Sequence, residues 1–254
     1  LDGFRLDAVK HIELSWLTDL RAKVKSTFVG KKFYMVGETY TGDKGTIKKY
    51  VNPSTMLDGQ FDFPMRYEMV RVILMRQGGF KDLDSFLNAN DNYYGYGSVM
   101  GTFIGNHDLP RAIHYAEDTP RFSSAWDSGK QVAWYNMPGA PAGSSAYQRM
   151  QVGFTALMTL PGVPLIYYGD EIGMPGGGDP DNRRFMQWSG LGSAQTSLKA
   201  HITKLTKIRA ANKALRYGKR AQKWMDNDTY VYTMSHAGAE LVVLLNRSDS
   251  AKTV

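Results

Sequence analysis

The sequence predicts an α/β fold in which short parallel strands alternate with helices, followed by a segment of antiparallel sheet. Short apolar runs recur along the first two thirds of the chain, and amphipathic helical patterns separate several of them. Strands that alternate with helices are typical of βαβ units and a parallel sheet. Near residue 217 the pattern changes to two strand-like runs around a short turn, which is typical of an antiparallel hairpin.

The parallel part of the prediction depends on five strand-like runs. They cover residues 3–7, 33–38, 59–63, 101–108 and 163–171. Helical spacing of apolar residues predicts helices over residues 12–24, 65–75, 147–160 and 197–215. A long polar stretch with Pro110, Pro120, Pro138 and Pro141 follows the fourth run. The predicted hairpin pairs residues 230–234 with residues 240–245.

The composition excludes several classes of protein. The 254 residues carry 31 Lys and Arg against 24 Asp and Glu, a formal net charge of +7, and 43% of them are hydrophobic. This is ample for a packed core, and no apolar run approaches the ~18 residues needed to cross a bilayer. The basic residues are spread along the chain, so a nucleic-acid interface is not predicted. The absence of cysteine excludes a disulfide scaffold and thiolate chemistry.

Carboxylates follow the predicted strands. They are Asp7, Glu38, Asp108, Asp170 and Glu171. In a (β/α) barrel the active site is built from residues at the carboxyl ends of different strands. A doubly wound sheet also binds ligands there, but the chain has no glycine fingerprint for a dinucleotide. The pattern therefore favours a barrel with an acidic site.

Paired carboxyl groups across a bond are the requirement of glycoside cleavage. One donates a proton to the leaving oxygen, and the other attacks the anomeric carbon or activates a water. A cluster of like charges raises the pKa of one of its members, which suits a general acid. Arg5 precedes Asp7 by two residues on the same strand, so we expect it on the same face, where it would keep Asp7 ionised.

Three stretches of the sequence resemble signature regions of the α-amylase family of glycoside hydrolases (glycoside hydrolase family 13). They are Asp2–His11, Val36–Glu38 and Phe103–Asp108, in the family's order, and Pro164–Gly173 resembles the family's last barrel strand. The resemblance implies a (β/α)8 TIM barrel of which residues 1–216 are strands four to eight. Residues 217–254 would be the start of a C-terminal antiparallel β domain, truncated at 254. The missing N-terminal half of the barrel would come from the rest of the protein or from another chain.

The resemblance also implies roles for individual residues. Asp7 would be the nucleophile, Glu38 the general acid and base, and Asp108 the group that holds sugar hydroxyls and stabilises the transition state. The residues expected to bind substrate are Arg5, Lys10, His11 and His107. In many relatives the backbone carbonyl at His11 also binds a structural calcium ion, and no organic cofactor is implied.

The function that these residues predict is retaining hydrolysis of α-1,4-glucosidic bonds in starch and maltodextrins. Alternatives are a cyclomaltodextrinase, neopullulanase or α-glucosidase-like member of the same family, and a catalytically inactive glucan-binding barrel or an inactive fragment. Starch is a polymer outside cells, so a secreted or periplasmic protein is expected, without nucleic-acid or membrane partners.

Other polar and aromatic residues have structural interpretations. Asp170 and Glu171 are predicted to be structural, and Asp179–Asn182 with Arg183 and Arg184 to form a capped, salt-bridged turn. Aromatic residues that could stack on sugars are more often core residues; these are Phe61, Phe63, Tyr67, Trp134 and Tyr135. Tyr93, Tyr94 and Tyr96, in a glycine-broken loop, are better candidates for contacts at the rim of a site.

Overall fold

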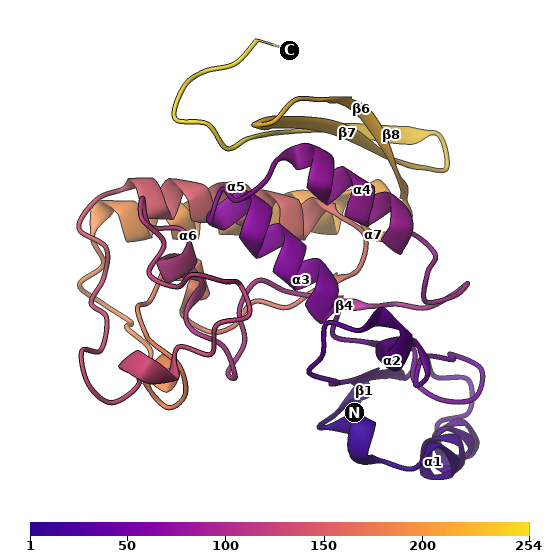
Figure 1. The fold of residues 1–254 in the computed structure, drawn as a ribbon. Coiled ribbons are helices and arrows are strands. Elements are labelled where there is room, and N and C mark those ends of the chain that lie inside the picture. Colours follow the sequence, from indigo (N-terminus) through magenta and orange to yellow (C-terminus); the bar gives the residue numbers. More distant parts are fainter. Residues whose placement is uncertain (254) are drawn as a thin grey trace. The chain divides into compact units, whose positions relative to one another are not determined.

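The computed structural model describes residues 1–253, and its ribbon is drawn in Figure 1. Val254, the last residue of the predicted C-terminal β domain, lies outside the described residues. The chain divides into two compact units. The first unit comprises Leu1–Arg66 with Phe86–Phe103, and the second comprises Tyr67–Ser85 with the chain from Ile104 onward.

The first unit contains a parallel sheet whose strands follow one another in chain order. Strands β1 (Gly3–Leu6), β2 (Tyr34–Gly37) and β3 (Gly59–Gln60) pair side by side. A parallel bridge between Phe61 and Gly101 continues this order to β4 (Gly101–Thr102). Parallel neighbours need a crossover connection, so this order matches the predicted alternation of strands and helices.

Helices and turns connect these strands. Helix α1 (Leu14–Thr27) lies between β1 and β2, and its Leu17 and Val24 are buried in one cluster with Leu6 and Met35 of the two strands. Helix α2 (Lys44–Lys48) follows β2, and the Asp43 side chain accepts hydrogen bonds from its first backbone N–H groups. The short 3-10 helix η1 (Val9–His11) directly follows β1. The core formed by α1, β1 and β2 holds these two strands in place, and with them the residues at their carboxyl ends.

The second unit is built mainly from helices. Helix α3 (Phe63–Met69) starts in the first unit and continues into the second as the π-helical segment η2 (Val70–Leu74); α4 (Phe80–Asn90) leads back into the first unit. The remaining elements are α5 (Ser145–Thr159), β5 (Val163–Pro164), α6 (Ser193–Ala211) and α7 (Lys213–Tyr217), with the 3-10 turns η3 (Ala112–Tyr115), η4 (Lys130–Val132), η5 (Asp170–Ile172) and η6 (Asp181–Arg183). A Cβ at Gly153 of α5 would lie 2.9 Å from Leu74 Cδ2, so glycine allows α5 and η2 to approach closely.

The last part of the second unit is a three-stranded antiparallel sheet. Strands β6 (Lys219–Met225), β7 (Thr229–His236) and β8 (Ala239–Asn246) pair in that order. Ala237 (φ 49°) and Gly238 (φ 83°) form the turn between β7 and β8, and two positive φ values are typical of the tight hairpin turn that matches strand twist. The predicted hairpin is confirmed, and β6 is a third strand that the sequence analysis did not place.

Several predicted elements differ in length from the observed ones. The third, fourth and fifth runs contain strands of only two residues each. Helices α2 and α4 were not predicted. The stretch after the fourth run is not a solvated connection, because Arg111–Ala116 is buried throughout. The predicted domain boundary at 217 stays a prediction.

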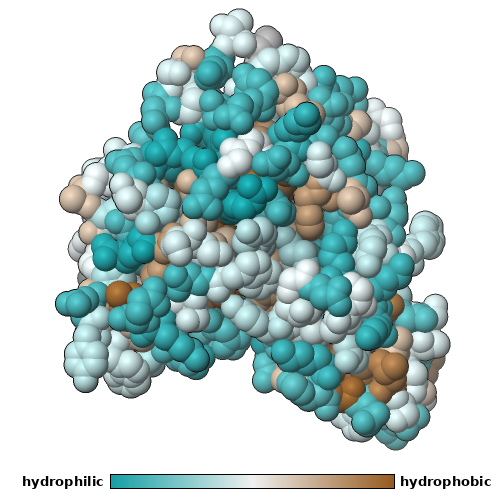
Figure 2. Space-filling model, in the orientation of Figure 1, coloured by the Kyte–Doolittle hydropathy of each residue, from teal (hydrophilic) through white to brown (hydrophobic). Residues whose placement is uncertain are grey.

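No helix among residues 1–253 is long and apolar enough to cross a membrane. On the face shown in Figure 2, hydrophilic and intermediate residues predominate, and hydrophobic residues form small separate groups.

Candidate active site

Asp7 and Glu38 follow strands β1 and β2 at matched positions. The register pairs Leu6 with Gly37, so each carboxylate residue is the next one along its strand. The Glu38 N–H donates to the Leu6 carbonyl at 2.8 Å, which continues the parallel ladder past the ends of the two strands. Because the strands are neighbours in one sheet, the structure brings Asp7 and Glu38 together at its carboxyl edge.

Glu38 is held by the backbone of the turn that follows β1. Glu38 is 6% exposed, and its Oε2 accepts a hydrogen bond from the Ala8 N–H at 3.1 Å. Its carbonyl accepts a second one from Val9 N at 2.8 Å. Ala8 has the left-handed conformation (φ 46°, ψ 42°), which costs an L-residue about 1–3 kcal/mol and is concentrated at functional sites. Sequence reasoning missed Ala8, since nothing in an alanine signals a positive φ.

Asp7 has the opposite environment. Its side chain is 73% exposed and forms an ion pair with Arg5 Nη1, whose side chain is 34% exposed. The Arg5 guanidinium lies 6.0 Å from the centre of the Phe61 ring, within range of a cation–π contact. The predicted pairing of Arg5 with Asp7 is therefore present. Of the two carboxylates that follow β1 and β2, Glu38 is buried and Asp7 is open to solvent.

Lys10 and His11 lie in η1, just beyond Asp7. Lys10 Nζ donates to the Tyr40 carbonyl at 3.4 Å, and the Tyr50 hydroxyl donates to the Lys10 carbonyl at 3.3 Å. Both Lys10 and His11 are exposed. The structure thus gathers the residues predicted on β1 and its turn with Glu38 in the first unit.

The predicted calcium ion would bind the backbone carbonyl of His11, an exposed residue of the turn η1. Among residues 1–253, no group of three or more His, Asp or Glu side chains is arranged to hold a metal ion. A calcium ion prefers six to eight oxygen ligands, several of them carboxylates. The calcium site stays a prediction, and no step proposed below uses the ion.

His107 and Asp108 lie side by side in the second unit. Their side chains are 42% and 38% exposed, with His107 Nε2 at 3.5 Å from Asp108 Oδ1. Arg183 Nη2 is 3.6 Å from the same oxygen. The Asp108 N–H donates to Asn106 Oδ1 at 3.0 Å, which closes a tight local turn. The roles of His107 and Asp108 stay predictions.

Asp170 and the turn after it agree with their structural interpretations. Asp170 is 1% exposed, and its Oδ1 lies 3.3 Å from Nη1 of the buried Arg111. In the turn, Arg184 pairs with Asp181 at 2.7 Å and Arg183 with Asp179 at 3.1 Å. These contacts stabilise the loop that faces the His107–Asp108 backbone.

The comparison with known proteins decides the family. The alpha amylase catalytic domain family matches residues 1–213. The chain belongs to the α-amylase family. This member is 33% identical over 253 residues to the beta/alpha-amylase of Paenibacillus polymyxa, covering 100% of the chain and 18% of that protein. It is 32% identical over 253 residues to the cyclomaltodextrin glucanotransferase of Bacillus sp. (strain 6.6.3), covering 98% of the chain and 30% of that enzyme.

A solved structure agrees with this assignment. The crystal structure of an Anoxybacillus alpha-amylase superposes with a TM-score of 0.78 at 26% identity, over 98% of this chain and 48% of that one. The predicted barrel family and the C-terminal antiparallel sheet are therefore confirmed, whereas the assignment to strands four to eight stays a prediction. The α-amylase family chain spans less than a third of the length of the two curated relatives named above.

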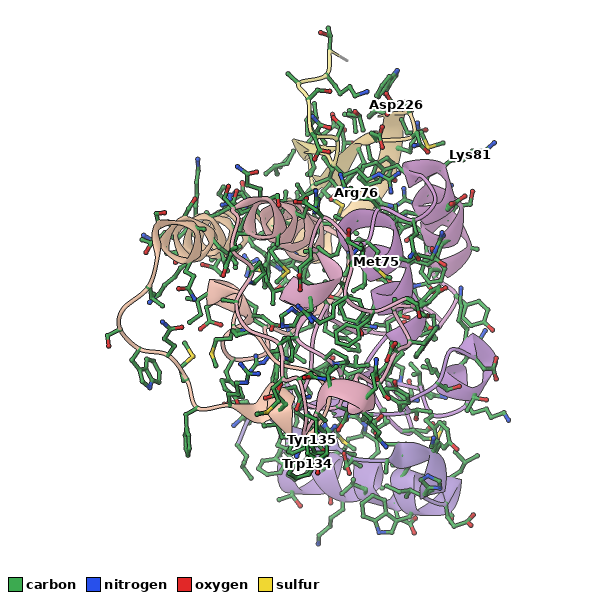
Figure 3. All side chains as sticks on the ribbon, turned by 60° about the vertical axis from the view of Figure 1, so that its left-hand side comes forward. Met75, Arg76, Lys81, Trp134, Tyr135 and Asp226 are labelled. Atoms are coloured by element: carbon green, nitrogen blue, oxygen red, sulfur yellow. The ribbon has the colours of Figure 1, made fainter. Side chains whose placement is uncertain are left out.

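The aromatic residues of this α-amylase family chain divide into buried and exposed groups. Tyr94 is buried, and its hydroxyl donates to Asp62, so it is not a rim residue, whereas Tyr96 is fully exposed. Trp134 and Tyr135 are 70% and 83% exposed, so the prediction that they are core residues is wrong. Figure 3 shows them side by side in the loop after η4.

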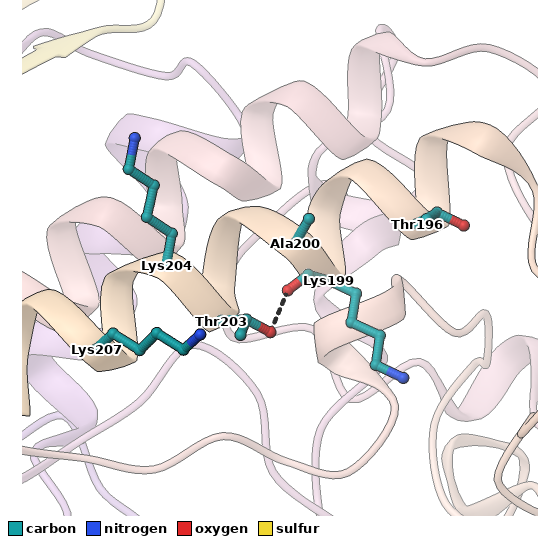
Figure 4. A pocket seen from close by; sticks show the side chains of 6 residues that line it. All are labelled: Thr196, Lys199, Ala200, Thr203, Lys204 and Lys207. Atoms are coloured by element: carbon teal, nitrogen blue, oxygen red, sulfur yellow. Dashed lines mark hydrogen bonds between the residues drawn. The ribbon is translucent and has the colours of Figure 1, made fainter.

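Two hollows on the surface of this α-amylase family chain are lined by residues other than Asp7 and Glu38. One of about 460 Å³ lies on α6 and is lined by Thr196, Lys199, Ala200, Thr203, Lys204 and Lys207 (Figure 4). Thr203 Oγ1 donates to the Lys199 carbonyl within the helix, and the three lysines form a solvated basic face. A second hollow of about 350 Å³ lies along β1 and is lined by Asp2, Gly3, Phe4, Arg5, Tyr34 and Val36.

Proposed function

We propose that the chain is part of a retaining glycoside hydrolase that cleaves α-1,4-glucosidic bonds in starch and maltodextrins. The observation that supports this most strongly is the pair Asp7 and Glu38 at matched ends of neighbouring strands, one exposed and one buried. Two carboxyl groups with different environments are the requirement of this reaction. Membership of the α-amylase family adds independent support.

The proposed first step uses both carboxyl groups at once. The Asp7 carboxylate attacks the anomeric carbon while the bond from that carbon to the leaving oxygen breaks and Glu38 donates its proton to that oxygen. The product is a glycosyl ester on Asp7 and a free sugar hydroxyl. The exposure of Asp7 leaves it accessible to a sugar, and Arg5 stabilises its negative charge until the new bond forms.

The second step reverses the first with water as the nucleophile. The Glu38 carboxylate takes a proton from water as the water oxygen attacks the anomeric carbon, and the bond to Asp7 breaks. Two displacements at one carbon retain its configuration. A retaining mechanism predicts that the carboxyl groups of Asp7 and Glu38 lie ~5–5.5 Å apart. The Ala8 N–H holds Glu38 in one orientation through both steps.

The remaining roles in the proposal come from the resemblance. Asp108 and His107 would hold the sugar hydroxyls next to the scissile bond, and Lys10 and His11 would line the leaving-group side. The rest of the barrel would be supplied by further polypeptide of the same protein or by another chain, in keeping with the share of the relatives that this chain spans. A secreted or periplasmic location is proposed because starch is found outside cells.

Replacing the carboxylates tests this function. In the complete enzyme, Glu38→Gln should lower turnover of maltodextrin by at least about a hundredfold, since general acid catalysis contributes 10²–10⁴. With a substrate that has an activated leaving group, the same variant should accumulate a glycosyl ester on Asp7, visible as an increase in intact mass. Asp19→Asn, an exposed carboxylate on α1, is the matched control and should retain full activity. Glu38→Gln with more than a tenth of normal turnover would refute the proposal.

A second candidate function is favoured by the relatives. Several similar proteins are cyclomaltodextrin glucanotransferases. Such an enzyme would use the same Asp7 ester but transfer the glycosyl group to a sugar hydroxyl instead of water. Cyclomaltodextrinase, neopullulanase and α-glucosidase activities also use this first step. Chromatography of the products from starch separates these activities, since transfer within one glucan chain gives cyclic products, whereas hydrolysis gives linear ones.

A further inference from the structure

Asn182 occupies an unusual position in the second unit. It lies in η6, its side chain is fully buried, and its Nδ2 donates to two backbone carbonyls at once. The acceptors are the carbonyls of His107 and Leu109, both at 2.8 Å. These are the two residues on either side of Asp108. One amide nitrogen therefore bridges the peptide units that flank the proposed catalytic carboxylate.

The geometry dictates the orientation of the amide. A side-chain amide carries two N–H donors on one nitrogen and an acceptor on its oxygen. With the amide turned over, Oδ1 would face two carbonyl oxygens, so only one orientation is compatible with these neighbours. Asn is short enough to do this from the adjacent turn, whereas Asp, Leu and Ala have no paired donors to offer.

Further contacts fix the turn that carries Asn182. Asp181 accepts from Arg184 Nε at 2.7 Å and from the Gly177 N–H at 2.7 Å. Arg183 Nε donates a second hydrogen bond to the His107 carbonyl at 3.1 Å, the third between this turn and the segment around Asp108. The turn is thus held by the hydrogen bonds of Asp181, and it is bonded to the segment around Asp108 through Asn182 and Arg183.

We propose that Asn182 is a positioning residue for Asp108: its bidentate amide fixes the backbone on both sides of that residue and so sets the direction of the carboxylate. The inference rests on the proposed role of Asp108 in glycoside cleavage. Asn106 holds the Asp108 N–H from the other direction at 3.0 Å. The backbone around Asp108 is then bonded at three points, while its carboxylate stays partly exposed.

The test replaces the amide in the complete enzyme. Asn182→Asp has the same shape but places a carboxylate against two carbonyl oxygens and removes both donors. We expect a loss of about 10–100-fold in kcat/KM on an aryl maltooligosaccharide, because a shift of ~1 Å in a catalytic group can cost 10²-fold. The inhibition constant of a cationic iminosugar, which resembles the transition state, should rise by a similar factor. Asn212→Asp is the matched control, since Asn212 Nδ2 donates to one helix-end carbonyl, that of Ile208, at 2.7 Å.

A double-mutant cycle with Asp108→Asn separates positioning from simple loss of stability. If Asn182 acts through Asp108, Asn182→Asp should cost less than about threefold in the Asp108→Asn background, because effects of coupled residues are not additive. An equal loss in both backgrounds, or lost activity with an unchanged inhibition constant, would show a merely structural role and overturn the inference. If the aspartate variant does not fold, Asn182→Ser, which keeps one O–H donor, takes its place in the same cycle. More than a tenth of normal turnover in Glu38→Gln would instead refute the proposed function.

Discussion

Arg247 stabilises the second unit by connecting the antiparallel sheet to the helices. It follows β8, is 4% exposed, and its Nη1 and Nη2 donate to the carbonyls of Val72 and Gly78. Its Nε lies 3.2 Å from Asp228 Oδ1. The last carbonyls of a helix have no partner within the helix, so Arg247 satisfies the end of η2 through Val72.

Arg247→Met keeps the aliphatic stem and removes all three donors, so its cost follows from the exposure of each acceptor. Val72 is fully buried, and leaving its carbonyl without this donor costs about 1–3 kcal/mol. Gly78 is exposed, so water replaces much of its hydrogen bond, and the partly exposed Asp228 contributes under about 1 kcal/mol. Burial lowers the pKa of Arg247, because burying its charge costs free energy in the folded state. Arg247→Met has no charge to bury, so the absence of this cost offsets part of the loss. We expect a net loss of about 2–3 kcal/mol.

Thermal unfolding measures this loss. At about 2–4 °C per kcal/mol for a chain of this size, the midpoint should fall by about 4–12 °C. Asp249→Asn is the matched control, because Asp249 pairs with Arg76 at 2.9 Å and lies 3.5 Å from Arg149, but its side chain is 77% exposed. That variant should stay within about 1 kcal/mol of the parent. A midpoint for Arg247→Met within 1 °C of the parent, or below it by no more than for Asp249→Asn, would refute the reasoning.

Three further predictions follow from single contacts. Ala8→Pro should reduce activity at least about tenfold, because it removes the N–H that holds Glu38 and its φ cannot be positive, whereas Ala8→Gly should stay active in the same assay. Burial raises the pKa of Asp62, so the folded state favours its proton, and stability is lost as pH rises from about 4; in denaturant titrations Asp62→Asn should remove this dependence. Gly105→Ala should destabilise by about 1–3 kcal/mol in urea, since its Cβ would lie 2.3 Å from Asp170 Oδ2, while Gly139→Ala, with open space around it, should be neutral.

Much of the fold follows from local patterns, and the errors have local causes. The third run was predicted as strand to Phe63, but α3 begins at that residue. Asp62 caps this helix, since its Oδ1 accepts from Met65 N at 3.0 Å, and Pro64 suits a first helical turn. Helix α4 also has a readable stripe of Phe80, Leu83 and Leu87, all buried, but its Asp and Asn residues lower its helix propensity.

Long-range contacts account for what the sequence could not show. Arg111 stands in a stretch with the composition of a polar loop, yet it is 1% exposed, and its guanidinium lies 4.3 and 4.6 Å from the ring centres of Tyr167 and Tyr168. Those partners are more than 50 residues away in the chain. The same holds for Asn182, whose role depends on carbonyl groups of residues 107 and 109, because any residue type can supply a backbone carbonyl.

The contacts of the two proposed catalytic carboxylates match the different charge cycles that they would undergo. The proposed nucleophile keeps its negative charge until it forms a bond, and Asp7 is paired with the permanently charged Arg5. The proposed acid must release and regain a proton in every turnover, and Glu38 is held by a neutral backbone N–H. A carboxyl group can accept from that N–H in both protonation states, because one oxygen remains an acceptor when the other carries the proton. The left-handed turn at Ala8 supplies that donor, so the backbone strain next to Asp7 serves the orientation of Glu38.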